Sequence, residues 1–318
     1  MEKIKVSVCM ITFNHGQFIE EAIKGVLSQK VDFGLELIIG DDCSKDNTIE
    51  IVRNYEMEYP NIIKVIRPER NQGMMKNFLS TMQACTGKYI ALCEGDDYWI
   101  DELKLQRQID FLEGNSDFVI SFHNSRFLFP NGSIKIQHKR GDLLCNMQDL
   151  IKENFIATAS CVFRNNLFKE FPDWAKSLPF GDWTLHILNA NYGKIKYHSE
   201  VMSIYRMHEG GVWSNIWTSN DPIKVLNAIR AKIEFYNNVD KLLSHKYACI
   251  IDRQKAKLFD KMLYECLRIR SGFKQDLLLL KFGISNRLVS SKFLISLLKY
   301  ALKKYVILPV NNLNKTGL

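Results

Sequence analysis

Apolar and polar positions alternate in blocks along the first third of the chain. Short apolar runs, each followed by polar residues, predict buried strands. The expected strands are Ile4–Thr12, Leu35–Ile39, Ile62–Ile66 and Lys88–Cys93. The segments between them carry apolar residues at helical spacing, most clearly in Phe18–Gln29 and Met74–Ala84. Strands and helices in this alternation predict an α/β fold with a mostly parallel, Rossmann-like sheet and helices on both faces.

A polar turn, DDCSKDNT, separates the second strand from the helix that follows it. Asp46 or Asn47 is placed to cap this helix, and Glu50 stands three residues after Asn47, as in a capping box. We therefore expect one of these side chains to hold the first helical turn.

The middle and the tail of the chain follow other patterns. Asn131-Gly132 between two apolar runs predicts a tight hairpin, and Asp221-Pro222 predicts the start of a helical region. The other expected elements are the strands Phe118–Phe122, Ser160–Arg164 and Lys194–Met207 and the helices Asp182–Ala190, Ile223–Tyr236, Ala248–Arg270 and Ser290–Leu308. We therefore expect an α/β domain over residues 1–218 and an α-helical extension over residues 219–318.

Composition places the chain among ordinary soluble globular proteins, with 46% apolar and 25% charged residues. The net charge of +8 favours an anionic partner without choosing one. The eight cysteines form no CxxC pair, which argues against a zinc site or a disulfide framework and favours a reducing cytoplasm. No apolar run approaches the roughly 20 residues of a membrane span.

The helix expected at Ser290–Leu308 is amphipathic, with Lys292, Lys299 and Lys303 opposite its leucines. Two interpretations stay open. The lysines can hold the helix on the anionic inner face of the membrane, or the leucines can pack on the α/β domain. We therefore expect a cytoplasmic protein, with peripheral membrane contact under the first interpretation.

Polar clusters follow three of the expected strands, at Thr12–Asn14, Asp41–Asp42 and Glu94–Asp97. Ligands of open parallel sheets bind at the carboxyl ends of the strands, so we expect these clusters to meet. A strand-end Asp can also be a simple turn or cap residue. Two carboxylates about 4 Å apart, however, repel by roughly 4 kcal/mol at a typical effective protein dielectric. A divalent ion such as Mg²⁺ or Mn²⁺ that also grips a diphosphate would offset this repulsion.

Five spaced blocks of the sequence resemble the family 2 glycosyltransferases, which have the GT-A fold. The blocks are VSVCMITFNHGQFIEEAIKGVLSQ, ELIIGDDCSKDNT, NQGMMKNFLSTMQACTGKYIALCEGDDYW, GDWTLHILNANYGKIKY and YRMHEGGVWS. The resemblance covers about Lys5–Ser214, in the family's order. It implies inverting transfer of a sugar from a nucleotide-diphosphate sugar to an acceptor hydroxyl, assisted by Mn²⁺ or Mg²⁺. It also implies a glycan or lipid-linked acceptor, as in polysaccharide biosynthesis, and no nucleic-acid partner.

The resemblance further assigns roles to single residues. Glu94 and Asp96 match the outer positions of the family's DxD motif, with Glu in place of the usual first Asp, and Asp97 follows. The implied metal ligands are Asp96 or Asp97, with His208 as a further one. The residues implied to contact the nucleotide sugar are Thr12, Phe13, Asn14, Asp41, Asp42, Lys76, Glu94, Asp96 and Arg206.

Asp182 occupies the place of the family's catalytic base, preceded here by Gly181 where Glu is usual. The alternative for Asp182 is a helix N-cap, and the two roles are compatible. Three tryptophans can stack on sugar rings or pack in the core: Trp99, Trp183 and Trp213.

Two other functions share parts of this pattern. A sugar nucleotidyltransferase would use a similar sheet and metal but is expected to have a Gly-rich phosphate loop after the first strand. Here Thr12–Gly16 contains one glycine. A non-catalytic sugar-nucleotide-binding module has no need of acids in three clusters. The motifs do not fix the sugar, the base or the acceptor.

Overall fold

The computed structural model describes residues 3–138, 141, 143–208 and 221–268, together with 281, 295, 299, 300 and 302. The chain divides into two compact units, Met1–His208 and Glu209–Leu318. Most of the helix expected at Ser290–Leu308 falls outside the described residues, as does Trp213. The hypotheses about membrane contact through that helix and about Trp213 therefore stay predictions.

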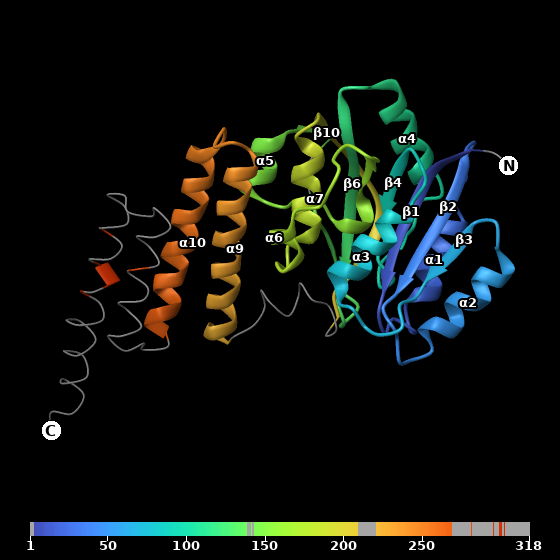
Figure 1. Ribbon diagram of the computed structural model, residues 1–318, viewed down its shortest axis with the longest axis horizontal. Helices are drawn as coiled ribbons and strands as arrows, with labels where there is room; N and C mark the ends of the chain where they lie inside the picture. Colours follow the sequence, from blue (N-terminus) through green and yellow to red (C-terminus); the bar gives the residue numbers. More distant parts are fainter. Residues whose placement is uncertain are drawn as a thin grey trace. The chain divides into compact units, whose positions relative to one another are not determined.

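A ten-stranded sheet forms the first unit (Figure 1). Its main path runs β3-β2-β1-β4-β9-β6-β10-β5, and off this path β7 pairs with β6 and β8 with β10. The strands are β1 Ile4–Thr12, β2 Gly34–Asp41, β3 Ile63–Ile66, β4 Tyr89–Leu92, β5 Tyr98–Trp99, β6 Phe118–Leu128, β7 Ile134–Ile136, β8 Leu143–Cys145, β9 Val162–Arg164 and β10 Lys194–Arg206.

Six of these strands run in one direction. The pairs β1–β2, β1–β4, β2–β3 and β6–β10 are parallel. Strand β9 is antiparallel to both β4 and β6, so those two also point the same way. The predicted mostly parallel α/β sheet is confirmed.

Helices cover both faces of the sheet. Helices α1 (Ile19–Leu27), α2 (Thr48–Glu58) and α4 (Lys104–Gly114) share one apolar core with alternate residues of β1, β2 and β4. Helix α3 (Met74–Gln83) packs on the opposite face, where Asn77 Nδ2 donates to the carbonyl of Gly40 at 2.8 Å. The approach is close: a Cβ at Gly40 would lie 2.0 Å from Thr81 Oγ1. The remaining helices of this unit are α5 Met147–Lys152, a 3₁₀ turn Thr158–Ser160, α6 Asp173–Lys176 and α7 Gly181–Ala190.

The capping box predicted for α2 is wrong. Asn47 is the N-cap residue, but its side chain makes no cap hydrogen bond. Instead Asp46 Oδ1 accepts from the backbone N–H of Thr48 at 3.0 Å and from its hydroxyl. The other oxygen of Asp46 accepts from the N–H of Gly16 at 2.9 Å. Asp46 therefore ties the start of α2 to the loop after β1.

The second unit contains an antiparallel pair of long helices, α9 (Pro222–Leu242) and α10 (Ala248–Arg268), drawn side by side in Figure 1. As predicted, Asp221 caps α9 and Pro222 stands in its first turn; Asp221 accepts from the N–H of Ile223 at 2.9 Å. Apolar side chains from both helices share a small core. In the part of the chain that the structure describes, no helix is both long and apolar enough to span a membrane.

Candidate active site

The loops after β1, β2 and β4 lie against one another, as predicted for the three polar clusters. Thr12 is the register partner of Asp41. The N–H of Asp42 donates to the carbonyl of Thr12 at 3.0 Å, and the N–H of Gly95 donates to the carbonyl of Ile11 at 2.9 Å. A Cβ at Gly95 would lie 2.7 Å from Thr12 Oγ1, so the acidic loop approaches β1 this closely because Gly95 has no side chain.

The loop after β1 is fixed by the loop after β2. Asn14 has a left-handed backbone with φ of 56°. Its N–H donates to Ser44 Oγ at 2.9 Å, and its Oδ1 accepts from the N–H of Lys45 at 2.8 Å. Phe13 beside it is 40% exposed, and the buried Oγ1 of Thr12 has no hydrogen-bond partner among the described residues. The loop therefore exposes the aromatic ring of Phe13, whereas the Thr12 hydroxyl is buried and the Asn14 side chain holds the loop itself.

The two aspartates at the end of β2, Asp41 and Asp42, are buried and hydrogen-bond to neighbouring loops. Asp41 accepts from Arg67 Nε at 3.3 Å and from the N–H of Ser44. Asp42 accepts from the N–H groups of Gln72 and Gly73, at 2.7 and 2.8 Å. Lys76, in the first turn of α3, is exposed. The predicted contact of these side chains with a nucleotide stays a prediction. The carboxylate of Asp42 orders the loop that leads into α3, and that of Asp41 holds the turn after β2.

The acidic residues after β4 share an electrostatic environment with Asp182. Burial, with the negative charges of Asp96 and Asp182, raises the pKa of Glu94 to about 8. Burial, with the charges of Asp96 and Glu94, also raises the pKa of Asp97 well above its ordinary value. Four carboxyl groups from two distant parts of the sequence therefore form one cluster, whose repulsion a cation would relieve.

Arg206, at the end of β10, holds the acidic loop Glu94–Asp97 by hydrogen bonds to Asp96 and Asp97. Its Nη1 donates to the carbonyl of Asp96 at 2.7 Å, its Nη2 pairs with Glu21, and its backbone N–H donates to Asp97 Oδ1 at 2.9 Å. The guanidinium carbon lies 4.4 Å from the ring centre of Tyr98. The predicted proximity of Arg206 to a diphosphate stays a prediction, and its observed contacts position the loop. The other oxygen of Asp97, Oδ2, is buried without a hydrogen-bond partner in the described chain.

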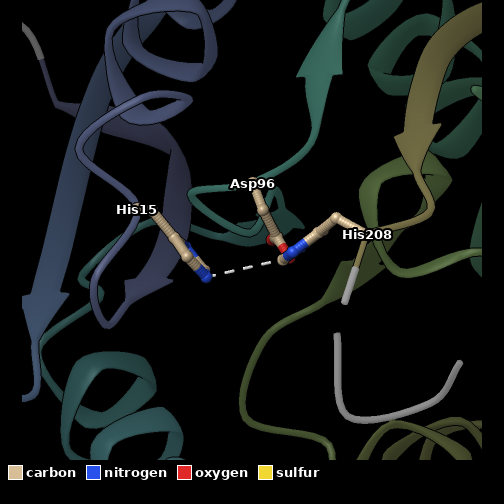
Figure 2. A group of neighbouring side chains, drawn as sticks. All are labelled: His15, Asp96 and His208. Carbon is tan, nitrogen blue, oxygen red and sulfur yellow. Dashed lines mark hydrogen bonds and ion pairs between the residues drawn. The ribbon is translucent and has the colours of Figure 1, made fainter. Parts of the chain in front are cut away.

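Asp96 meets two imidazoles, those of His15 and His208 (Figure 2). His208 Nε2 lies 2.9 Å from Asp96 Oδ2, and His15 Nε2 lies 3.8 Å from the same oxygen. Burial alone would raise the pKa of Asp96, but the hydrogen bond with His208 and the nearby His15 hold it below its ordinary value. His15 was not predicted as a site residue, although it directly follows the first polar cluster, Thr12–Asn14. Asp97, predicted as an alternative ligand, is not part of this group.

Asp182 lies in the first turn of α7 and is held by Asn154. The Nδ2 of Asn154 donates to Asp182 Oδ2 at 2.7 Å. The helix N-cap is Phe180, so the cap interpretation of Asp182 is wrong. Burial raises the pKa of Asp182, although the N–H of Trp183 and the Asn154 amide act in the opposite direction. A half-buried carboxylate with a raised pKa and one fixed oxygen suits a proton acceptor.

The family model described as glycosyl transferase family 2 matches residues 7–171, just over half of the chain. This span contains most of β1, all of β2 and β4 and the acidic loop, and it stops before Asp182. The chain belongs to glycosyl transferase family 2.

One relative and two solved structures are similar to this chain over most of its length. An uncharacterised protein of Mycobacterium tuberculosis is 35% identical over 218 residues, which cover 67% of this chain and 62% of that protein. TarS residues 1–349 from S. aureus, solved with UDP, superposes with a TM-score of 0.60 at 18% identity, covering 86% of this chain and 77% of that one. The mannosyltransferase PcManGT from Pyrobaculum calidifontis, solved with GDP-Man and Mn²⁺, gives a TM-score of 0.54 at 14% identity, covering 95% and 87%. The GT-A type fold predicted for this family 2 chain is confirmed.

Two tryptophans of this family 2 domain lie too deep to stack on a sugar. Trp99 and Trp183 are 3% and 1% exposed. Their indole N–H groups donate to the carbonyls of Ala159 and Leu150, each at 2.8 Å. Both residues are core residues, and the sugar-stacking hypothesis is wrong for them.

Proposed function

We propose that this chain is an inverting glycosyltransferase that uses a nucleotide-diphosphate sugar, a divalent cation and Asp182 as the catalytic base. The observation that carries the proposal is that Asp182, on α7, lies near Glu94 and Asp96 after β4, where burial together with the charges of Asp96 and Asp182 raises the pKa of Glu94. Membership of family 2 supports the reaction class. The UDP and GDP-Man in the neighbouring structures support a nucleotide-linked donor without choosing the base.

The donor would lie across the loops after β1 and β4. The exposed ring of Phe13, beside Thr12, is available to the base, and the half-buried Glu94 is assigned to the ribose hydroxyls. Asp41, Asp42, Asn14, Lys76 and Arg206 complete the proposed nucleotide site, the first three chiefly by ordering its walls. The acceptor is proposed to be a hydroxyl of a glycan or lipid-linked saccharide.

The residues present fit a divalent cation. Asp96 and His208 offer an oxygen and a nitrogen 2.9 Å apart, and the buried Oδ2 of Asp97 lacks a partner among the described residues. When bound, the cation would act as a Lewis acid and neutralise charge on the leaving diphosphate. The protein's part is to hold the ligands in place, which Arg206 does through the carbonyl of Asp96.

Asp182 is proposed to accept the proton of the acceptor hydroxyl. Asn154 donates to Oδ2 of its carboxylate and the N–H of Trp183 also stabilises the charged form, so the protein holds the carboxylate in one orientation. Attack on the face opposite the diphosphate inverts the anomeric centre, and base assistance of this kind typically contributes about 10²- to 10⁴-fold in rate.

Replacing Asn154 with Ala tests how the base is tuned. The Asn154 amide lowers a pKa that burial has raised, so its loss raises the pKa of Asp182 further. A general base works deprotonated, and that form is lost as pH falls through the pKa. We expect the acid limb of the kcat/KM profile to move to higher pH, with about tenfold lower activity on that limb per pKa unit and a smaller loss at pH 8. An equal loss at every pH would make Asn154 structural. Asn238→Ala, on α9 in the other unit, is the control.

Product analysis tests the proposed function. The full chain is incubated with a panel of nucleotide sugars, Mn²⁺ and saccharide acceptors, and the released product is identified. Release of nucleoside diphosphate supports glycosyl transfer. A parallel incubation with sugar phosphate and nucleoside triphosphate tests the alternative, and pyrophosphate release there would show a nucleotidyltransferase. Binding of a nucleotide sugar without turnover in either mixture would show a sugar-nucleotide-binding module.

A further inference from the structure

His15 reaches the same point as Asp96 and His208 from a third segment of the chain. His15 follows β1, Asp96 follows β4 and His208 follows β10. Figure 2 shows the three side chains pointing toward one another. One ligand-type atom from each lies within 4.8 Å of the other two.

The His15 ring is held at this point without a hydrogen bond of its own. The carbonyl of His15 accepts from the N–H groups of Phe18 and Ile19, both at 2.8 Å, which anchors the residue to the start of α1. The Phe18 ring packs against both imidazoles, with centroids 6.4 Å from His15 and 5.0 Å from His208. His15 Nδ1 is buried and has no partner among the described residues, and Nε2 is 3.8 Å from Asp96. Among the described residues no group lies within hydrogen-bond distance of this ring, so its Nε2, on the side of Asp96, is available to a further ligand.

We propose that His15 is a third protein ligand of the divalent cation, beside Asp96 and His208. The proposal rests on the proposed function only in placing a cation at Asp96. Adjacent ligands of one metal ion lie about 3 Å apart, because each lies about 2.1 Å from the metal. The separations of 2.9 and 3.8 Å to Asp96 Oδ2 therefore need only a small contraction.

Two imidazoles and one carboxylate select a class of metal. Magnesium takes oxygen ligands and keeps its waters, whereas imidazole nitrogen suits first-row transition metals. The set assigned here therefore favours Mn²⁺ and its transition-metal neighbours over Mg²⁺. His15 acts as the selectivity residue, since His15→Gln leaves one imidazole and one carboxylate.

Metal binding to the full chain, without any sugar donor, tests the assignment. Free Mn²⁺ is measured by electron paramagnetic resonance in titrations of wild type and His15→Gln, and Mg²⁺ affinity is measured by competition. We expect His15→Gln to weaken Mn²⁺ binding about tenfold or more, the scale of losing a metal-site partner. We expect Mg²⁺ affinity to change less, so that the preference for Mn²⁺ shrinks. His245→Gln, in the turn before α10, is the control and should bind as wild type.

Pulsed electron paramagnetic resonance of bound Mn²⁺ tests the proposal on the wild-type protein alone, so it holds even if the variant fails to fold. Wild type should show ¹⁴N couplings from two imidazoles and His15→Gln from one. Three results would each overturn the proposal. They are ¹⁴N coupling from one imidazole only in wild type, unchanged Mn²⁺ affinity in His15→Gln, and no Mn²⁺ binding with or without a nucleoside diphosphate. The two proposals can fail separately. If Mn²⁺ shows two imidazole ligands but no sugar donor is turned over, the proposed function is wrong and the His15 assignment stands. If a donor is turned over but Mn²⁺ shows one imidazole ligand, the His15 assignment is wrong.

Discussion

The Asp182→Asn variant is expected to lose transfer activity by about 10²- to 10⁴-fold, the usual contribution of a positioned general base. Asparagine keeps the shape of the side chain and an oxygen that can accept from Asn154 Nδ2, which now donates to Asp182 at 2.7 Å. It cannot take up a proton at neutral pH. We therefore expect kcat to fall while nucleoside diphosphate affinity, measured by calorimetry, changes little.

Asp173→Asn is the matched control for this variant. Asp173 lies on α6 with its side chain 94% exposed and pairs with Lys176 on its own helix. It should retain wild-type activity. Full activity in Asp182→Asn would show that Asp182 is not the catalytic base. Loss of nucleotide binding together with a lowered Tm would show that Asp182 supports the fold rather than the reaction.

The Asp96→Asn variant is expected to lose Mn²⁺ affinity by about 100-fold or more. Loss of a residue that only supports a metal ligand costs up to about 100-fold, and Asp96 is proposed to bind the metal directly. The carboxylate of Asp96 is the group shared by both imidazoles, at 2.9 Å from His208 and 3.8 Å from His15. Its replacement by a neutral amide removes the only negative charge among the three. Donor turnover should fall in parallel and recover in part at high Mn²⁺ concentration.

Asp117→Asn controls for the removal of a carboxylate alone. Asp117 precedes β6 and forms an exposed ion pair with Lys194 at 2.7 Å. We expect it to bind Mn²⁺ as wild type does. If Asp96→Asn bound Mn²⁺ with unchanged affinity, the cation site would have to be assigned to other residues.

The parallel half of the sheet was predictable because its strands are continuous apolar runs. Strand β1 spans Ile4–Thr12 as predicted, and β4 differs from its prediction only at the ends. The resemblance to family 2 also located the acidic loop and Asp182. What these segments share is a local pattern, either apolar periodicity or a motif, that can be read without knowing the neighbours.

Elements that bury polar residues were missed or shortened. Helix α4 was not predicted, because its inner face includes Lys104, whose ammonium lies 4.0 Å from the ring centre of Trp99 and donates to Gln108. Strand β6 continues beyond Phe122 through buried His123, Asn124 and Ser125. The polarity of such residues predicts exposure to solvent. They are buried here because residues elsewhere in the fold supply their partners.

The candidate site shows the same limit. The carboxylates that the motifs marked do lie together, but His15 and Asn154 have no local pattern that identifies them. His15 is set by the turn that Asn14 and Gly16 make with the loop after β2, and Asn154 by its contact with α7. Their roles depend on contacts across about 30 to 190 residues of sequence, such as that between His15 and His208.

The central claim is that the acidic loop after β4 holds a divalent cation that in turn holds the diphosphate of a sugar donor. Calorimetric titration of the full chain with UDP, GDP and dTDP, in Mn²⁺ and again in EDTA, tests it most directly. We predict that at least one of these nucleotides binds in Mn²⁺ and that its affinity falls about tenfold or more in EDTA. Equal affinity in both conditions, or no binding of any nucleoside diphosphate, would contradict the claim.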